Sequence, residues 1–347
     1  MTTINTPPLT ALPPPIEYTY QTGLTLSKLE AIRADLSERL TTITTPFEIA
    51  TESGRLAGVL YALGEAAGAL AAVETALRAA EAAKETALGG YLACVGGAAA
   101  CFQGQYQRGA NYFEEAEQAF AASGDSIGEA FRRQAYAREY ASDLRQFSKT
   151  TEYLTVAVQV LRGRVPQTVI IENLLTQAAC MVHQNELRRT REIIQQAEAL
   201  MNEQKAHWFR PELAVIKADI AVLEGNTEDA LKHCYTGLGG IGDSGDLRML
   251  SPLYLLLGII LEREKNRESD VQDALDRAIA TGRVRARRLH LALALRQMGM
   301  HMRRLTARNT VRAKGSGFLF EAERMLGEIQ LSEQFPTAPA APLPQIL

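Results

Sequence analysis

The sequence predicts an all-α protein built from repeated helical hairpins, and three observations support this fold class. Small and apolar residues recur at helical spacing with a long and regular period. No segment shows the strand-like alternation and tight turns that are typical of β-hairpins. Of the 347 residues, 46% are hydrophobic but only 6% are aromatic, which suits close packing of helix on helix. These features predict an α-solenoid of antiparallel hairpins, in which each unit buries its apolar face on its neighbours.

The clearest copy of the repeat runs from Gly104 to Phe120, where a small turn residue and an aromatic residue precede a helix. Within it, Gly109, Phe113 and Ala116 lie on one helix face because they are four and three positions apart. Related triplets occur at Ala69–Val73–Ala76, Thr150–Leu154–Ala157, Thr190–Ile194–Ala197, Ala230–Cys234–Gly237 and Val271–Leu275–Ala278. The last residues of the six triplets are 40, 41, 40, 40 and 41 positions apart, which indicates an array of similar units.

The predicted helical-repeat domain covers residues 23–335, between two segments that lack the composition of a folded unit. Residues 1–22 form a Pro- and Thr-rich arm that we expect to be disordered, and residues 336–347 form a Pro- and Ala-rich tail. From Thr25 to Leu40 the apolar positions predict an amphipathic helix that does not match the repeat. It is expected to cap the array, since an end repeat has one face without a neighbour. Pro46 suits the first turn of the next helix.

Each later unit is predicted to consist of two antiparallel helices, ended by Gly, Pro or polar turn residues. The predicted pairs are Leu88–Gln103 with Gln107–Ala122, Ile127–Leu144 with Lys149–Leu161, Thr168–His183 with Arg188–Asn202, and a helix ending at Leu223 with Thr227–Leu238. A strongly apolar helix after Pro252 opens the sixth unit. A long basic helix opens a seventh, irregular unit, whose second helix is expected around Phe318 to Ile329.

The pattern resembles the tetratricopeptide repeat family in a long variant of 40 or 41 residues, where the usual repeat has about 34. The resemblance is carried by Gly97, Gly104, Tyr106, Phe113 and Ala116, with the same frame at Gly225, Ala230 and Leu238, and it covers roughly Pro46 to Ile279. It implies a right-handed superhelix, similar to the repeat domains of some bacterial transcription activators and of adaptor proteins. It specifies the fold rather than the function.

Such a superhelix implies a concave groove lined by the first helix of each unit. The groove-facing candidates for binding a partner are Tyr91, Cys94, Arg132, Glu139, Glu172, Glu212 and Asp219. Small apolar residues with scattered charges suit a peptide or helix of another protein. The alternative is that about half of such positions only pack against neighbouring helices.

Local matches to catalytic or cofactor motifs have simpler explanations. Residues 237–242 satisfy G-x-G-x-x-G, but they follow a helix rather than a strand, so we expect a flexible turn that ends the helix. Cys94 and Cys101 lie on one helix face without the further His or Cys residues of a zinc site. No phosphate loop or nucleophile elbow is present. We therefore expect no enzyme activity, no cofactor and no metal.

Composition and targeting features favour a cytoplasmic protein. The four cysteines show no paired spacing, which argues against a disulfide framework and suits a reducing compartment. The N-terminus lacks a basic start followed by an apolar run, so no secretion signal is expected. The uncharged run from Thr86 to Gln107 is long enough to cross a bilayer. It is in phase with the repeats, however, so we interpret it as part of one and expect no membrane partner.

A basic segment in the seventh unit is the strongest charge feature of the chain. Between residues 277 and 320 there are eleven basic residues and no acidic one, so this segment carries +11 while the rest of the chain, whose total is −3, carries −14. The basic residues are Arg277, Arg283, Arg285, Arg287, Arg288, Arg296, Arg303, Arg304, Arg308, Arg312 and Lys314. They either neutralise acidic helices within the protein or form a patch for an acidic protein segment or nucleic acid. Aromatic residues that could stack on single-stranded bases are not interleaved with them, which argues against nucleic acid.

Two functions remain open at the level of sequence. One is an interaction scaffold or adaptor that holds a partner protein in the groove and an acidic partner on the basic unit. The other is a ligand-sensing regulator whose basic unit contacts nucleic acid. The sequence contains no recognisable nucleic-acid-binding module, which favours the scaffold.

Overall fold

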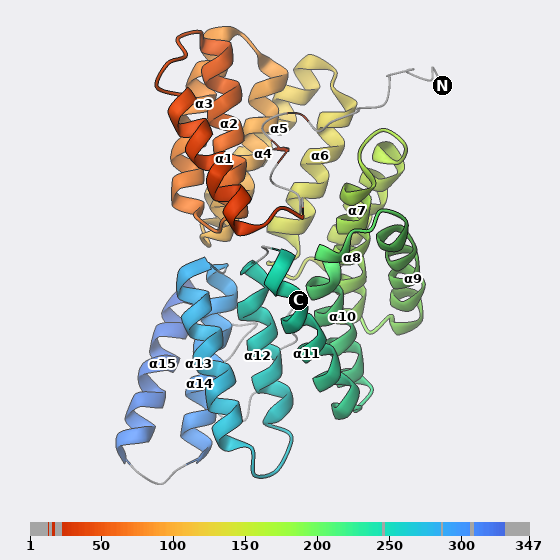
Figure 1. Ribbon diagram of the computed structural model, residues 1–347, viewed down its shortest axis with the longest axis vertical. Coiled ribbons are helices and arrows are strands. Elements are labelled where there is room, and N and C mark those ends of the chain that lie inside the picture. The colour runs from red at the N-terminus through yellow and green to blue at the C-terminus, as the bar shows by residue number, and fades with distance from the viewer. Residues whose placement is uncertain are drawn as a thin grey trace.

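The protein is all-helical in the part of the chain that the structure describes. This structure is a computed structural model, and it describes residues 13, 16–17, 23–244, 247–285, 287–305 and 309–329. Every regular element in these ranges is a helix, as predicted, and successive helices pack against one another (Figure 1). The predicted tail at 336–347 and most of the predicted arm lie outside the described residues.

One helix and seven helical hairpins follow one another along the described chain. The first helix is α1 (Leu26–Arg39). The hairpins are α2 (Pro46–Ala62) with α3 (Ala66–Ala83), α4 (Thr86–Phe102) with α5 (Tyr106–Ser123), α6 (Ser126–Tyr136) and η2 (Ala137–Ala141) with α7 (Phe147–Leu161), α8 (Gln167–His183) with α9 (Leu187–Glu203), α10 (Arg210–Leu223) with α11 (Thr227–Ser244), α12 (Leu250–Leu261) with α13 (Glu268–Arg285), and α14 (Arg288–Leu305) with α15 (Asn309–Glu328). Short helical turns, η3 (His207–Phe209) and η4 (Leu247–Met249), precede α10 and α12.

Local chemistry explains where several helices begin. Thr45 caps α2 by accepting a hydrogen bond from the Glu48 amide, while its hydroxyl donates to the Glu48 carboxylate at 2.6 Å. Thr45 and Glu48 have the spacing of a capping box, with the Glu48 carboxylate bound to the Thr45 hydroxyl, and Pro46 occupies the first turn as expected. Asp125 caps α6 by accepting from the Gly128 amide at 2.8 Å. At the start of α2 and of α6, a nearby side chain thus accepts from an amide that lacks a partner within the helix.

The backbone repeats with the period that the sequence predicts. The residue in the left-handed conformation after the first helix of each of the first six hairpins is Gly64, Gly104, Arg145, Asn185, Gly225 and Asn266, with φ between +57° and +78°. These six residues are 40, 41, 40, 40 and 41 positions apart, the same spacing as the triplets. We refer to them as the hairpin-turn positions. Glycine and asparagine tolerate positive φ because of their small or locally hydrogen-bonding side chains.

Three elements differ from the predicted ones. The first helix of the third hairpin was expected to continue to Leu144, but it becomes the π-helix η2 after Tyr136. Residues 237–242 were expected to form a flexible turn, but they lie within α11. A Cβ on Gly237 would come within 2.9 Å of Ala214 and 2.8 Å of Leu253, so glycine there permits close packing of α11 on its neighbours. The helix expected around Phe318 begins earlier, as α15.

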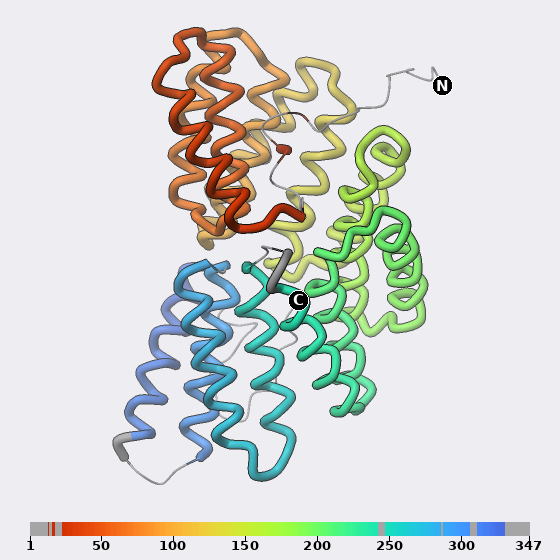
Figure 2. Tube along the Cα trace, in the orientation of Figure 1, coloured from red at the N-terminus to blue at the C-terminus, as the bar shows by residue number. Residues whose placement is uncertain are grey.

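The hairpins follow a curved path that brings the last ones beside the first (Figures 1 and 2). Helices α1–α6 form one half and α10–α15 the other, with α7–α9 along one side (Figure 1). The two halves meet at the hairpin turns. A Cβ on Gly64 would lie 3.0 Å from the backbone oxygen of Arg285, and one on Gly104 would lie 2.6 Å from Ile329. The chain therefore closes on itself.

The described residues of the N-terminal arm contact the helices. Ile16 is buried, and Glu17 forms an ion pair of 3.3 Å with Arg55 on α2. Gly23 lies against the ring of Trp208 in η3, since a Cβ there would approach the ring to 2.5 Å. These contacts show that at least this part of the arm lies on the helical domain.

Candidate functional site

A pocket of about 140 Å³ lies at the junction of the two halves, and six of the seven hairpins contribute to its lining, together with Arg248 and Met249 of η4. The place along the first helix at which a residue lines the pocket differs from one hairpin to the next. It is near the C-terminal end of α2 and α4 at Tyr61 and Phe102, in the middle of α8 at Thr176, and near the start of α10 and α14 at Glu212 and Leu289. We call this cavity the central pocket. Because an engineered cavity of about 150 Å³ is known to bind benzene, the central pocket has room for a ligand of roughly six to ten heavy atoms.

A buried network of ion pairs forms one wall of the central pocket. We call it the Arg287 cluster, and its members are Tyr106, Arg138, Glu139, Asp143, Glu172 and Arg287. Arg287 Nη1 donates to Asp143 Oδ1 at 2.9 Å, and Arg287 also pairs with Glu139 in η2. The Tyr106 hydroxyl donates to Asp143 Oδ2 at 2.9 Å. Arg287 and Glu139 are 148 positions apart, so the cluster joins the seventh hairpin to the third.

The rest of the Arg287 cluster continues into the fourth hairpin. Arg138 Nε donates to Glu139 Oε1 at 2.5 Å, and Arg138 also pairs with Glu172 on α8. Glu139 is fully buried within a π-helix, a local structure that often marks functional sites. Buried charges of this kind are tolerated only when they are paired and hydrogen-bonded, as they are here.

Burial and neighbouring charges shift the titration of the two acids that face Arg287. Burial raises the pKa of Asp143 to about 6, although Arg287 and the Tyr106 hydrogen bond favour its carboxylate. Burial also opposes ionisation of Glu139, but Arg287 and Arg138 outweigh it and lower the pKa of Glu139. Glu139 is thus the firmly ionised partner of Arg287, and Asp143 is the partner that takes up a proton in mildly acidic solution.

Two further arginines line the central pocket and lie over aromatic rings. The Arg145 guanidinium carbon is 5.2 Å from the ring centroid of Phe147, and that of Arg248 is 5.4 Å from the ring centroid of Tyr61. Phe147 in turn stacks on His183 at 4.6 Å. Burial lowers the pKa of Arg145, which nevertheless stays positively charged at neutral pH. The lining therefore contains four arginines and four acids, with Glu212 as the fourth acid.

Two further polar side chains line the central pocket. Tyr61 is 1% exposed, and its hydroxyl acts as a hydrogen-bond donor toward Glu139. It lies near Glu139 and favours the ionised form of that carboxylate. Burial raises the pKa of Tyr61, so the hydroxyl keeps its proton and can donate. His290 Nδ1 lacks a hydrogen-bond partner in the described part of the chain, and burial beside Arg287 lowers the pKa of His290 to about 3.

Three of the seven groove residues predicted from the sequence line the central pocket. These are Glu139, Glu172 and Glu212. The structure thus brings together acids from the third, fourth and fifth hairpins, which the resemblance placed on one concave face.

The other four predicted groove residues are buried elsewhere. Tyr91 donates to Asp125 at 2.9 Å, and Arg132 pairs with Glu129 at 2.7 Å and with Glu117 at 3.3 Å. Cys94 and Asp219 are each 3% exposed. These four side chains face neighbouring helices because the first helices bury more than one side, so helical periodicity alone does not separate the concave face from the contacts between hairpins.

Members of the predicted basic patch have different environments. Arg287 belongs to the buried cluster, and Arg296 is 1% exposed, so neither lies on an open surface. Three others pair with acids of their own half, as Arg283 with Glu321, Arg288 with Glu328 and Arg304 with Glu262. Arg285 and Arg303 are half-buried, whereas Arg277, Arg312 and Lys314 are exposed. Arg308 lies outside the described residues.

The described ranges show no metal site and no reactive cysteine. No three His, Cys, Asp or Glu side chains gather there as a metal site would require. All four cysteines are buried and free, and burial raises their pKa values, those of Cys180 and Cys234 to about 12. None of them is therefore a thiolate at neutral pH. No helix in these ranges combines the length and apolar character that crossing a membrane demands.

The sequence reasoning missed several residues of the central pocket, above all Arg145. The other missed residues are Tyr61, Arg138, Asp143 and Arg248. Arg145 carries a signal that the repeat period makes visible, since it occupies a hairpin-turn position where every other described copy has Gly or Asn. The remaining residues give no such signal, because they meet only when the chain closes.

Comparison with known proteins adds no family assignment. No protein-family model matches the chain, and no curated protein matches it at a significant level.

Proposed function

We propose that this protein is a non-catalytic, ligand-responsive binding protein, in which a small molecule in the central pocket controls how the first and last hairpins meet. The architecture we propose for it is a right-handed solenoid similar to tetratricopeptide repeats. The observation that carries the proposal is the lining of the central pocket by residues of six of the seven hairpins and of η4, including both ends of the array. A ligand that contacts both ends binds the closed arrangement more tightly than an open one, and it therefore stabilises the closed arrangement.

Size and charge favour this function over a groove for a partner helix. An α-helix with its side chains is about 10 Å wide, far more than a cavity of about 140 Å³ accepts. A small polar molecule or a single side chain fits. We propose a cytoplasmic location, which the four free cysteines support. The outer surface, including the exposed arginines, is where a protein partner or nucleic acid would respond to closure.

Equilibrium dialysis against a mixture of cellular metabolites, read out by mass spectrometry, tests this function. Ala179→Phe places a large side chain in the central pocket, whereas Ala71→Phe changes an exposed alanine on α3 and is the matched control. We expect the wild-type protein and the Ala71 variant to retain at least one compound that the Ala179 variant does not. Retention of no compound, or of the same compounds by all three proteins, contradicts the proposal.

The second candidate function is a scaffold for a partner peptide, and a second groove favours it. This groove of about 530 Å³ lies between α7, α8 and α9 and is lined by Val158, Leu174, Met181 and Ile193 with Arg162 and Arg189 at its polar positions. Pull-down from native cells, with and without nuclease, tests this function. A partner that survives nuclease and is lost in Ile193→Arg supports the scaffold, whereas a partner unaffected by Ile193→Arg argues against it.

A further inference from the structure

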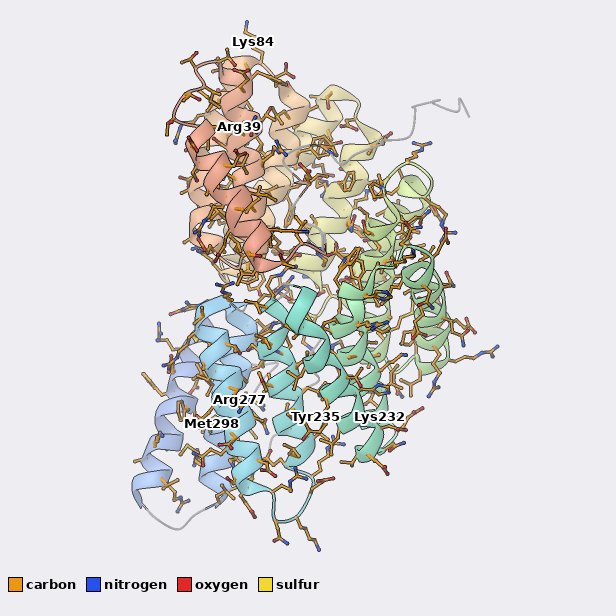
Figure 3. All side chains as sticks on the ribbon, viewed as in Figure 1. Arg39, Lys84, Lys232, Tyr235, Arg277 and Met298 are labelled. Carbon is orange, nitrogen blue, oxygen red and sulfur yellow. The ribbon has the colours of Figure 1, made fainter. Side chains whose placement is uncertain are left out.

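The charged side chains that line the central pocket already interact within the protein. Arg138 and Arg287 hold the three acids of the Arg287 cluster. The other charged lining residues, which also interact with further residues of the chain, are Arg145, Arg248 and Glu212. They differ in this respect from an outward-pointing charge such as that of Lys84, which is exposed and projects from the edge of the molecule (Figure 3).

The charges of the lining are also balanced, because four arginines face four acids. A charged ligand loses its hydration when it enters such a pocket, and this loss must be compensated by a charge of opposite sign. The charges of the lining are engaged with one another and with the rest of the chain. An uncharged ligand does not need such compensation, so the charge pattern favours an uncharged molecule.

His290, near the start of α14, is a polar group of the lining that has no hydrogen-bond partner. Its Nδ1 atom is buried, and neither ring nitrogen makes a hydrogen bond to a described residue. Burial and the charge of Arg287 lower the pKa of His290 to about 3, so at neutral pH the ring is uncharged and offers one donor and one acceptor. A buried polar atom without a partner is costly, and a bound molecule often satisfies it.

Other neutral polar side chains of the lining already have partners. The hydroxyls of Ser142 and Thr176 each donate to the backbone oxygen four positions earlier, at 3.2 Å and 3.0 Å. The Tyr61 hydroxyl donates toward Glu139. His290 is therefore available to recognise the polar group of a ligand.

Apolar side chains lie next to His290 in the lining. Leu293 is three positions after His290 on α14, so the two residues are neighbours on the helix surface. Phe102, Met249 and Leu289 add further apolar surface. The volume of about 140 Å³ limits the apolar part of a ligand to roughly one ring or a short chain.

We propose that the central pocket binds a small uncharged molecule with one hydroxyl group on an apolar body, and that this hydroxyl hydrogen-bonds to His290. A hydroxyl can donate or accept, so it can pair with either nitrogen of a neutral imidazole. A primary amide has two donors as well as an acceptor, which is more than one imidazole satisfies. This inference rests on the proposed function and adds the chemical class of the ligand and the residue that recognises it.

Phenol is the probe for this proposal, because it joins one hydroxyl to one ring and is uncharged at neutral pH. Titration calorimetry with the full-length protein at constant ionic strength compares phenol with toluene, which lacks the hydroxyl, and with benzoate and benzylammonium, which are charged. We expect phenol to bind roughly three- to tenfold more tightly than toluene, as one hydrogen bond would give. We expect no measurable binding of benzoate or benzylammonium.

His290→Leu tests the role of the imidazole. Leucine is apolar and cannot hydrogen-bond, so we expect this variant to lose the preference for phenol over toluene. Retained binding of toluene shows that the pocket of the variant is intact. His207→Leu, which changes an exposed histidine in η3, is the matched control and should leave both affinities unchanged.

The other outcomes separate this inference from the proposed function. Binding of benzoate or benzylammonium as tight as that of phenol overturns the uncharged class. A preference for phenol that survives His290→Leu overturns the assignment of His290. Failure of phenol to bind more tightly than toluene overturns the inference, whereas the proposed function is then decided by the metabolite dialysis, which is not limited to hydroxyl compounds.

Discussion

Arg287 is the single residue on which the contact between the third and seventh hairpins most depends. It pairs with Glu139, whose side chain is fully buried, and with Asp143, whose side chain is 7% exposed. Removing one partner from a buried ion pair leaves the other charge without compensation, which typically costs about 3–5 kcal/mol. We therefore expect Arg287→Ala to lower the free energy of unfolding by roughly that amount in urea denaturation.

The neighbouring residue provides the control for this prediction. Arg288 pairs with Glu328, but both side chains are partly exposed, at 35% and 43%. Exposed ion pairs contribute about 0–1 kcal/mol, so Arg288→Ala should have little effect. Equal losses in the two variants would show that the Arg287 cluster is no more important than an ordinary surface pair.

Asp219 gives the fold a dependence on pH. Burial raises the pKa of this carboxyl from 3.8 to about 7. Between these values the folded state holds a proton that the unfolded chain has released, so stability falls as pH rises from about 4 to about 7 and levels off above it. Asn at this position does not titrate. The stability of Asp219→Asn relative to the wild type should therefore increase by on the order of 2 kcal/mol between pH 5 and pH 8.

Denaturation curves at several pH values test the role of Asp219. Glu228→Gln, an exposed change on α11, should run parallel to the wild type across the same range. If Asp219→Asn also runs parallel, then the carboxyl does not change its protonation between pH 5 and pH 8.

At the scale of elements, the turn between α4 and α5 is where the second hairpin contacts the last one. Gly104 has a φ of +76°, and an added Cβ would lie 2.6 Å from Ile329 and 2.9 Å from Arg288. We expect Gly104→Ala to weaken the contact between the second and last hairpins, because the side chains of Ile329 and Arg288 must move to make room for the added Cβ. Small-angle scattering should show a larger radius of gyration.

Gly225, at the corresponding turn of the fifth hairpin, provides a control that distinguishes a steric clash of the added Cβ from strain in the backbone. Gly225 has a nearly equal φ of +74°, but nothing lies within 4 Å of an added Cβ. Gly225→Ala should thus lower stability by about 1 kcal/mol without changing the radius of gyration. An unchanged radius in Gly104→Ala would mean that the closed arrangement does not depend on this contact.

The period and most helix bounds could be predicted from the sequence, because they depend on local chemistry. The triplet Gly109, Phe113 and Ala116 is on the packed face of α5, where the spacing placed it. The change to a π-helix after Tyr136 could not be predicted, because it goes with long-range pairing of Glu139 with Arg287. Local preference there is overridden by contacts made across the fold.

The candidate site was predictable only in part. Glu139, Glu172 and Glu212, which the resemblance placed on a concave face, line the central pocket together. The meeting of the third and seventh hairpins was not foreseen, because it depends on the small rotation that each hairpin adds to the next. Arg287 therefore looked like one member of a basic patch and is instead an internal partner of two acids.

At the scale of the whole molecule, the remaining question is whether the exposed arginines of the last hairpin bind an anion. Arg303 on α14 is half-buried and Arg312 on α15 is exposed, and no ion pair is found for either one within the described residues. Arg304 is a poorer choice for substitution because it pairs with Glu262 at 2.6 Å. Positive charges without nearby acids attract polyanions, and the attraction weakens as the screening length shortens to about 10 Å at 0.1 M salt.

We expect poly-glutamate to bind the wild-type protein at low ionic strength and the double variant Arg303→Glu with Arg312→Glu to bind it at least tenfold more weakly. The control reverses Arg188 and Arg189 on α9, whose side chains are 95% and 65% exposed, and so changes the net charge by the same amount at another place. Melting temperatures of both variants should stay near that of the wild type, because exposed charges contribute about 0–1 kcal/mol each. Equal weakening in both variants would mean that net charge, rather than this surface, determines binding.

A DNA duplex in place of poly-glutamate distinguishes the two partner classes. For DNA, the logarithm of affinity should fall linearly with the logarithm of salt concentration, with a slope set by the number of phosphates contacted.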